Sequence, residues 1–579
     1  MAILAKRRFA VRMRSKSRIG ERILAKHQAP ADPSGEATSQ QQSERVACNS
    51  EFTDMLAAFE ACVRERPDGI AVYYFDRSFT YAELEQQSRT AAHWLIDAGV
   101  KRGDRVSIVL QNMPQFVVMT IAAWRIGAIP VPGNPMYKGA EMARIFADCE
   151  PSVVLCLDTC HSEMAAALDI AEVPACLLVT SSRAYQSRND ERVIPAQIQI
   201  NEAVWFEDVL AIPNSKPLPE IAYEPADLGL ILYTSGTTGV PKGAMITHHN
   251  LAFNGEALDT YCHLDAGSRI LALAPLFHIT GMSCHFAASL CARAAMILQY
   301  RVEPSLLLDT IKEHRPTYTI GAITAFNALM NVPGIMPEDV SSFDRVYSGG
   351  APIPPSLLKA IKDKLHISIH SAYGMTESTA HTHISPFGAD IPVDPTSGAL
   401  SIGKVMPCTA ARVIGDDGLE LPCGEVGELL LKGPQVMAGY WRRPDETASA
   451  LQDGWMHTGD VAFVDADGWY YLVDRIKDVI IASGFKVWPR EVEDVLYEHP
   501  AVREAAVVGA PDAYRGETVR AFVSLVPGTT VEPQDLVNHC RDRLAAYKAP
   551  SCVEIRGELP KTVTGKIQRL ALRQEFAGN

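Results

Sequence analysis

Short apolar runs alternate with longer amphipathic segments along the sequence from residue 51 to about residue 434. Runs such as RVSIVL, SVVLCL, RILALA, TYTIGAI and RVYSGG are typical of buried strands. Between them, YAELEQQSRTAAHWLIDAG has helical spacing, and its apolar residues predict a helix that Gly99 ends. Because βα units of this kind form parallel sheets, the alternation predicts an α/β fold with parallel-rich sheets.

The chain has 579 residues, which is too long for one hydrophobic core. Beyond a charged cluster at residues 474–478, the sequence shows a separate αβ pattern, long enough for a small domain. We therefore expect a large N-terminal domain over residues 51–476 and a small α+β C-terminal domain over residues 477–579.

Residues 1–50 form a basic leader followed by a polar linker that we expect to be disordered. Nine Lys or Arg and one acid stand in residues 1–26. We interpret this leader as a solvated tail or an upstream extension, with an organelle transit peptide as the alternative. The expected location is the cytoplasm, or the mitochondrial matrix if the leader is a transit peptide.

The formal net charge of −14 argues against a nucleic-acid partner, because a phosphate backbone is normally met by excess Lys and Arg. The longest apolar stretch, FVVMTIAAW, is too short to cross a bilayer and predicts a buried helix. Peripheral membrane contact remains open, as does the choice between monomer and homodimer. Thirteen scattered cysteines fit a reducing, intracellular compartment.

The segment Tyr233–Gly243, YTSGTTGVPKG, is the strongest candidate for binding chemistry. Its glycines let the backbone approach an anion, its hydroxyls donate hydrogen bonds, and its lysine adds a positive charge. Pro241 stands where a Walker A loop needs glycine, so the loop is of another type. The predicted phosphate-binding residues are Thr234, Ser235, Gly236, Thr237, Thr238, Gly239 and Lys242.

This segment resembles the signature of the acyl-adenylate-forming superfamily, which includes acyl-CoA synthetases, peptide-synthetase adenylation domains and firefly luciferase. The resemblance extends to SGGAP, YGMTE, GWMHTGD and PKTVTGK, from about residue 52 to residue 572, and is closest to medium- and long-chain fatty acyl-CoA ligases. It implies that ATP or AMP is bound by Gly349, Gly350, Ala351, Tyr373, Gly374, Met375, Thr376, Asp460 and Arg475. It also implies Mg²⁺ at Glu377, with Ser235 as a second candidate ligand.

The resemblance implies two half-reactions with ATP, Mg²⁺ and coenzyme A. A carboxylate first displaces pyrophosphate to give an acyl-AMP, with Lys566, Lys242, Thr376 and Glu377 as the catalytic residues. The small domain is then expected to turn about a hinge at Lys477. This movement would withdraw Lys566 and bring Ser483, Gly484 and Phe485 to coenzyme A. Lys561 is the weaker of the two C-terminal lysine candidates.

The resemblance places the acyl pocket at His278, Gly281, Gly321 and Ala372. Because small apolar segments surround these positions, we expect a medium- or long-chain fatty acid, with aryl or branched acids still open. No aspartate lies between Pro275 and Met282 to bind an amino-acid ammonium group. Two alternatives remain: a ligase that loads acyl-AMP onto a carrier protein, and a catalytically silent nucleotide-binding homologue.

Overall fold

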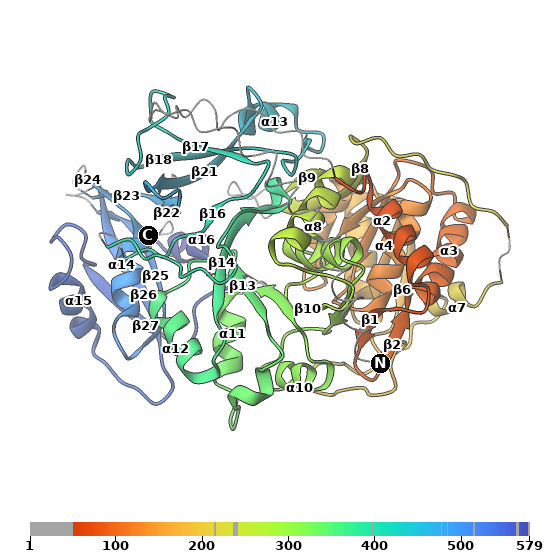
Figure 1. Cartoon of the computed structure of the whole chain (residues 1–579), viewed down its shortest axis with the longest axis horizontal. Helices are drawn as coiled ribbons and strands as arrows, with labels where there is room; N and C mark the ends of the chain where they lie inside the picture. Colours follow the sequence, from red (N-terminus) through yellow and green to blue (C-terminus); the bar gives the residue numbers. More distant parts are fainter. Residues whose placement is uncertain are drawn as a thin grey trace, which may run out of the picture. The chain divides into compact units, whose positions relative to one another are not determined.

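The computed structural model describes residues 50–213, 216–234, 241–395, 398–475, 478–482, 485–512, 516–562 and 567–576. It confirms the expected α/β fold with parallel-rich sheets (Figure 1). Within these ranges the strands form five sheets.

The largest sheet has nine strands in the order β16-β15-β14-β13-β12-β10-β11-β1-β2. Neighbouring strands from β14 to β1 run parallel, whereas β2, β15 and β16 are antiparallel additions at the edges. Three predicted strands, RILALA, TYTIGAI and RVYSGG, are β10, β12 and β13. The nine strands are β1 (Ile70–Tyr74), β2 (Arg77–Thr80), β10 (Arg269–Ala272), β11 (Ala295–Leu298), β12 (Tyr318–Gly321), β13 (Arg345–Gly349), β14 (Ile369–Met375), β15 (Ala380–Ile384) and β16 (Lys404–Val405).

Both faces of this sheet are buried, as expected for parallel strands. Along β10, Leu271 packs with residues of α10 (Pro304–His314), α11 (Ile323–Met330) and α12 (Pro355–Leu365). Its neighbours Ile270 and Ala272 belong to the core on the other face, which includes residues of α8 (His248–Tyr261) and α9 (Ala288–Cys291). The alternation follows from the two-residue period of a strand.

A second sheet, in the order β4-β3-β5-β6-β7, is parallel throughout. The predicted helix is α3, which begins after a capping box between Thr80 and Glu83 and ends before Gly99, whose φ is 87°. The apolar stretch FVVMTIAAW lies in α4 and is buried along its whole length. The elements are β3 (Arg105–Val109), β4 (Ile129–Pro132), β5 (Val153–Leu157), β6 (Cys176–Thr180), β7 (Val204–Trp205), α2 (Met55–Glu65), α3 (Tyr81–Asp97), α4 (Pro114–Arg125), α5 (Gly139–Cys149), α6 (His161–Ala171) and α7 (Phe206–Leu210).

Three smaller sheets complete the described chain. The first contains β8 (Leu228–Thr234), β9 (Lys242–Thr247) and β19 (Gly439–Tyr440). The second contains β17 (Ala410–Ile414), β18 (Gly427–Lys432), β20 (Leu451–Gln452), β21 (Trp455–Val464) and β22 (Tyr470–Arg475), and α13 (Pro444–Ala450) precedes β20. The third, near the C-terminus, contains β23 (Ile480–Ala482), β24 (Phe485–Val487), β25 (Val502–Asp512), β26 (Gly516–Leu525) and β27 (Cys552–Arg556), with helices α14 (Pro489–Tyr497), α15 (Pro533–Arg541) and α16 (Arg569–Gln574).

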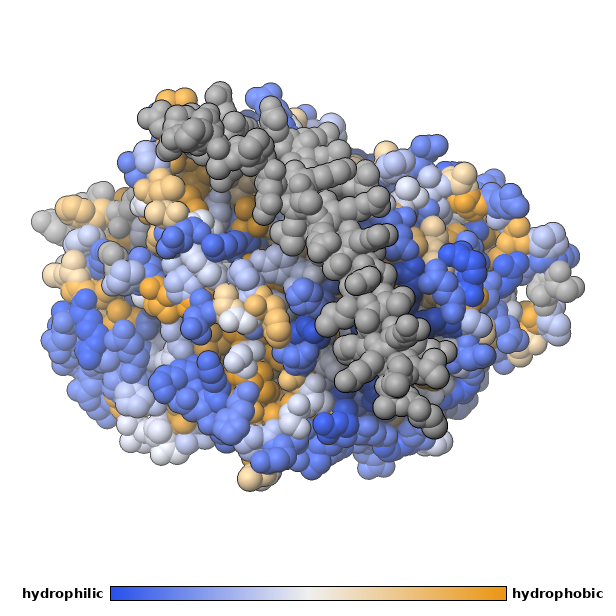
Figure 2. Space-filling view, viewed as in Figure 1, coloured by the Kyte–Doolittle hydropathy of each residue, from blue (hydrophilic) through white to orange (hydrophobic). Residues whose placement is uncertain are grey.

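Among the residues that Figure 2 colours by hydropathy, hydrophilic ones cover most of the visible face. Apolar residues appear on this face as smaller groups between them. Among the helices in the described ranges, none has both the length and the apolar character needed to span a membrane.

Candidate functional site

The predicted phosphate-binding loop connects two paired strands. Strands β8 and β9 are antiparallel, and Thr234 at the end of one pairs with Lys242 at the start of the other. The Thr234 hydroxyl also donates a hydrogen bond to the Lys242 carbonyl at 3.4 Å. These two residues therefore form the base of the connection. The other predicted loop residues, Ser235, Gly236, Thr237, Thr238 and Gly239, lie outside the described residues.

The predicted metal ligand and the predicted phosphate-binding lysine meet at one tyrosine, Tyr440. Its hydroxyl donates a hydrogen bond to Glu377 Oε1 at 2.8 Å, and Lys242 Nζ lies 4.3 Å from the centre of its ring. Burial, reinforced by the neighbouring Glu377 carboxylate, raises the pKa of Tyr440, so its hydroxyl stays protonated. Thr376 begins the short 3₁₀ turn that carries Glu377. The sequence analysis missed Tyr440, because a two-residue strand carries no periodic signal.

The predicted adenine-binding residues lie on neighbouring strand ends of the largest sheet. Gly349 at the end of β13 pairs with Ala372 of β14, and a Cβ atom on Gly349 would lie 2.3 Å from the Ala372 carbonyl oxygen. Gly350 follows with a φ of 77°, a region that side chains other than glycine rarely adopt. A Cβ atom on Gly374 would lie 1.4 Å from the carbonyl oxygen of Ala380. Close backbone packing thus requires glycine at Gly349 and Gly374; Ala351 and Met375 are their near neighbours in the chain.

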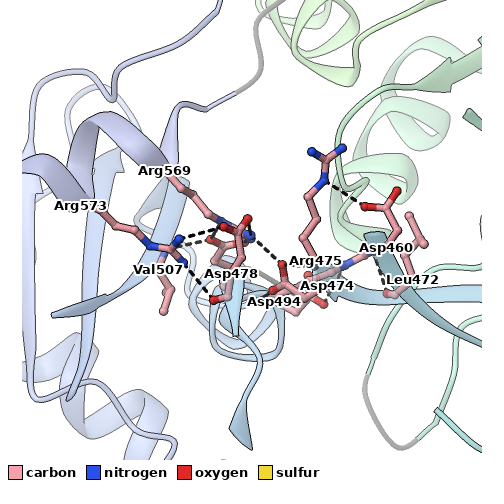
Figure 3. A network of polar contacts seen from close by, with 11 residues as sticks. Asp460, Leu472, Asp474, Arg475, Asp478, Asp494, Val507, Arg569 and Arg573 are labelled. Atoms are coloured by element: carbon pink, nitrogen blue, oxygen red, sulfur yellow. Dashed lines mark hydrogen bonds and ion pairs between the residues drawn. The ribbon is translucent and has the colours of Figure 1, made fainter. Parts of the chain in front are cut away.

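The predicted ribose ligands form a cluster with Tyr373, in which Asp460 and Tyr373 are buried and Arg475 is half-buried. Asp460 on β21 pairs with Arg475 on β22, and Arg475 Nε lies 2.9 Å from Asp460 Oδ1 (Figure 3). The Tyr373 hydroxyl donates to Asp460 Oδ2 at 2.7 Å. Asp460 is the main cause of the raised pKa of Arg475. Three residues predicted from separate motifs are therefore brought into direct contact.

The predicted acyl-pocket residues fall on adjoining parts of the same sheet. Gly321 ends β12 and pairs with Ser348 of β13, next to the Gly349–Ala372 pair. A Cβ atom on Gly321 would lie 2.5 Å from the Leu273 side chain. Ala372 on β14 is buried, and β13 separates it from Gly321 on β12.

His278 and Gly281 occupy the segment that follows β10. The half-buried His278 accepts a hydrogen bond from the Thr280 backbone N–H at its Nδ1 atom, at 3.3 Å. Gly281 starts a π-helical segment (Gly281–Ala287), and a Cβ atom there would lie 2.0 Å from the Pro275 carbonyl oxygen. His285 in this segment is 3.1 Å from the Ile320 carbonyl, which ties the segment to β12. π-Helical segments of this kind are frequent at functional sites.

Several predicted residues of the C-terminal region lie outside the described residues: Lys477, Ser483, Gly484 and Lys566. Phe485 begins β24 and is 56% exposed, with its ring stacked on Tyr547 at 4.8 Å. Lys561 makes an ion pair with Glu504 at 2.6 Å and forms a β-bridge with Ile567.

A network of largely buried charges includes Asp474 and Asp478 (Figure 3). Arg569 of α16 contacts Asp474 of β22 at 2.9 Å, Glu493 of α14 at 2.5 Å and Asp478 at 3.4 Å. Arg573 adds a second contact to Asp478 at 3.0 Å. Its contacts join residues up to 95 positions apart in the chain, so local sequence patterns could not predict it.

Asp494 lies beside this network. Because of its raised pKa, we expect the free energy of unfolding to fall as the pH rises. Burial raises the pKa of Asp494 to about 7, although Arg490, 3.7 Å away, opposes the shift. Because the folded pKa lies above the unfolded value of about 4, protonated Asp494 is favoured by folding. Its contribution is complete below pH 4 and is lost as the pH rises through 7, a loss on the order of 2 kcal/mol between pH 5 and pH 8.

Urea unfolding at pH 5 and pH 8 measures this loss. We expect Asp494→Asn to have a smaller difference in unfolding free energy between the two pH values than the unsubstituted chain. Asp542→Asn, at an exposed helix end, serves as the matched control and should leave the pH dependence unchanged. Equal pH dependence for Asp494→Asn and the unsubstituted chain would contradict the prediction.

Comparison with known proteins identifies the family. Residues 59–441 match the AMP-binding enzyme family and residues 491–566 match the AMP-binding enzyme C-terminal domain. The chain is 34% identical to a long-chain-fatty-acid–CoA ligase of Bacillus subtilis (strain 168), over 91% of this chain and 94% of that protein. It is also 34% identical to a feruloyl-CoA synthase of Amycolatopsis sp, over 89% and 97% respectively.

A solved structure agrees with these matches. ATP-bound MatB from Rhodopseudomonas palustris superimposes with a TM-score of 0.80 at 29% identity, covering 90% of this chain and 99% of that one. The chain belongs to the AMP-binding enzyme family, as an AMP-forming acyl-CoA synthetase that uses ATP and coenzyme A.

Proposed function

We propose that this synthetase activates a medium- or long-chain fatty acid. The observation that carries the proposal is the chemistry of the predicted acyl-binding positions. Gly321 on β12 and Ala372 on β14 stand on either side of β13, and neither offers a charged or hydrogen-bonding side chain to the acid. An apolar chain is the substrate that such small, apolar positions accept without leaving a polar group unpaired. The similarity to a long-chain-fatty-acid–CoA ligase supports the same substrate class.

We propose that the nucleotide is bound by the clusters described above. Asp460 would accept hydrogen bonds from the ribose hydroxyls, and the ring of Tyr373 would border the adenine. Lys242, Thr376 and the glycine-rich loop would bind the phosphates, with Arg475 reaching the α-phosphate. The contact of Tyr373 and Arg475 with Asp460 supports one shared nucleotide site.

The residues present fit a magnesium ion, because Mg²⁺ prefers hard oxygen ligands beside phosphates. Glu377 supplies such a ligand: Tyr440 holds Oε1, and Oε2 accepts no hydrogen bond from the described residues. Ser235, the second candidate ligand, lies outside those residues. When bound, the ion would neutralise charge on the phosphate oxygens.

We propose two half-reactions on this site. The substrate carboxylate attacks the α-phosphorus of ATP, a new O–P bond forms, and pyrophosphate leaves with the electron pair of the broken bond. The thiolate of coenzyme A then attacks the acyl carbon and displaces AMP. Lys566 would stabilise the first step, and a turn of residues 477–579 relative to residues 51–476, about Lys477, would bring Ser483, Gly484 and Phe485 to the second.

A second candidate substrate class is an aryl acid. The chain is as similar to a feruloyl-CoA synthase as to a fatty-acid ligase, at 34% identity in both cases. His278 could then accept or donate a hydrogen bond to a polar substituent of the ring.

Competition between acids tests the proposal. We expect acyl-CoA formation from an equimolar mixture of octanoate, palmitate, ferulate and benzoate to favour a fatty acid by at least about tenfold in kcat/KM. Mass spectrometry of the thioesters identifies the products. A preference for ferulate or benzoate would replace the fatty-acid proposal with the aryl one. Acyl-AMP without any thioester would point to another acceptor.

We also propose that the reaction takes place in the cytoplasm, where both ATP and coenzyme A are available. Fractionation of cells that express a tagged chain, with and without residues 1–26, tests this location. Transfer to an organelle that depends on residues 1–26 would contradict it.

A further inference from the structure

We propose that Tyr440 is a positioning residue that holds the Glu377 carboxylate and the Lys242 ammonium group in place for Mg²⁺ and ATP. This inference rests on the roles proposed above for Glu377 and Lys242. The Tyr440 hydroxyl donates to Glu377 Oε1 at 2.8 Å, and Lys242 Nζ lies 4.3 Å from the ring centre. One neutral side chain thus contacts two groups of opposite charge that would meet the same triphosphate.

The backbone around Tyr440 is bonded to the elements that carry both groups. Strand β19 pairs with β9, which begins at Lys242, and the Trp441 N–H donates to the Gly243 carbonyl at 2.7 Å. On the other side, the Met437 N–H donates to the Glu377 carbonyl at 2.8 Å. Residues 437–441 therefore connect the base of the phosphate loop to the turn of Glu377. A shift of Tyr440 relative to either group would break these bonds.

The arrangement keeps Glu377 and Lys242 from neutralising each other. A direct ion pair would satisfy both charges and compete with Mg²⁺ and phosphate, but in the described chain neither residue makes an ion pair. Instead, the face of the Tyr440 ring attracts the ammonium group, and the hydroxyl fixes one carboxylate oxygen. Both charged groups are thus held in position before the ligand binds, which is the preorganisation expected of a site that stabilises charge.

Two substitutions separate the two contacts. Tyr440→Phe removes the hydroxyl and keeps the ring, whereas Tyr440→Leu removes both. Calorimetric titration of ATP into the full chain, repeated over a range of Mg²⁺ concentrations and once in EDTA, measures binding without turnover. We expect Tyr440→Phe to raise the Mg²⁺ concentration for half-maximal ATP affinity about tenfold and to leave binding in EDTA unchanged. Tyr440→Leu should also weaken binding in EDTA, by about threefold or more.

The matched control is Tyr471→Phe. The Tyr471 hydroxyl also donates to a carboxylate, Asp465 Oδ2 at 3.1 Å, but no predicted site residue is involved. We expect this variant to keep the Mg²⁺ dependence of the unsubstituted chain. Excess Mg²⁺ should restore ATP affinity in Tyr440→Phe, which loss of folded structure alone would not allow.

Glu377→Gln distinguishes the inference from the function on which it rests. If Glu377→Gln raises the Mg²⁺ requirement but Tyr440→Phe does not, Tyr440 has no positioning role and the inference fails alone. If Glu377→Gln leaves the Mg²⁺ requirement unchanged, the proposed metal role of Glu377 fails and the inference fails with it. Stronger Mg²⁺ dependence in both variants, with Tyr471→Phe unchanged, supports both.

Discussion

Replacement of Lys566 by alanine is expected to lower acid-dependent pyrophosphate release about 100- to 1,000-fold. Negative charge on the α-phosphate oxygens increases as the carboxylate attacks, and removal of one group that stabilises such charge typically has an effect of this size. The second half-reaction should respond differently, because the lysine is proposed to leave the site before coenzyme A attacks. We therefore expect Lys566→Ala to convert added acyl-AMP and coenzyme A to thioester at a rate within about threefold of the unsubstituted enzyme.

Lys561 provides a matched control, five residues before Lys566 in the chain. Its ammonium group forms an ion pair with Glu504 at 2.6 Å and therefore already has a partner in the C-terminal region. Lys561→Ala should accordingly retain pyrophosphate release within about threefold, although it removes the same charge from a position five residues away. Equal losses for the two variants would show that the general charge of this segment is responsible. A loss of pyrophosphate release only in Lys561→Ala would show that Lys561, and not Lys566, is the catalytic lysine.

The parts of the fold that could be predicted are those encoded by local pattern. Apolar runs identified β3, β5, β10, β12 and β13, and helical spacing that ends at Gly99 identified α3. Motif spacing also placed candidate residues at strand ends, because turns after parallel strands gather at one edge of a sheet.

The contacts that organise the site depend on long-range pairing and could not be predicted. Tyr440 lies 63 residues from Glu377 in the chain and contacts it only because β19, a strand of two residues, pairs with β9. No periodicity marks so short a strand. The hydrogen bond from Tyr373 to Asp460 likewise joins two motifs whose separate roles were inferred, but whose contact the sequence did not reveal. The contacts of Arg569 likewise join distant parts of the chain and could not be predicted from the sequence.

Arg569 is expected to contribute more than any other charged residue to the stability of the C-terminal region. It contacts Asp474, Asp478 and Glu493, whose side chains are 15% exposed or less. Asp474 belongs to β22 before residues 476–477, while Asp478 and Glu493 follow them. Arg569 therefore joins the two sides of the proposed hinge. Without it, carboxylates that are largely excluded from water would lose their main cation.

Arg569→Ala should lower the free energy of unfolding by about 3–5 kcal/mol, the range typical of breaking a buried ion pair from one side. Hydrogen exchange of the full chain should show the loss as faster exchange in α14, β25 and α16. A second substitution, Glu493→Gln, should recover part of the loss, because it removes one of the uncompensated charges. This recovery would not occur if Arg569 acted only through the packing of its aliphatic carbons.

Arg556→Ala is the control that isolates burial as the cause. Arg556 also forms ion pairs, at 2.8 Å to Glu554 and 2.6 Å to Glu575, but these carboxylates are 45% and 44% exposed. Water can solvate them once the arginine is gone, so we expect a loss of about 1 kcal/mol or less. If Arg569→Ala and Arg556→Ala destabilised the chain equally, the buried network would have no special role. A larger loss for Arg569→Ala, recovered by Glu493→Gln, would show that the charges at the proposed hinge stabilise this arrangement of the C-terminal region.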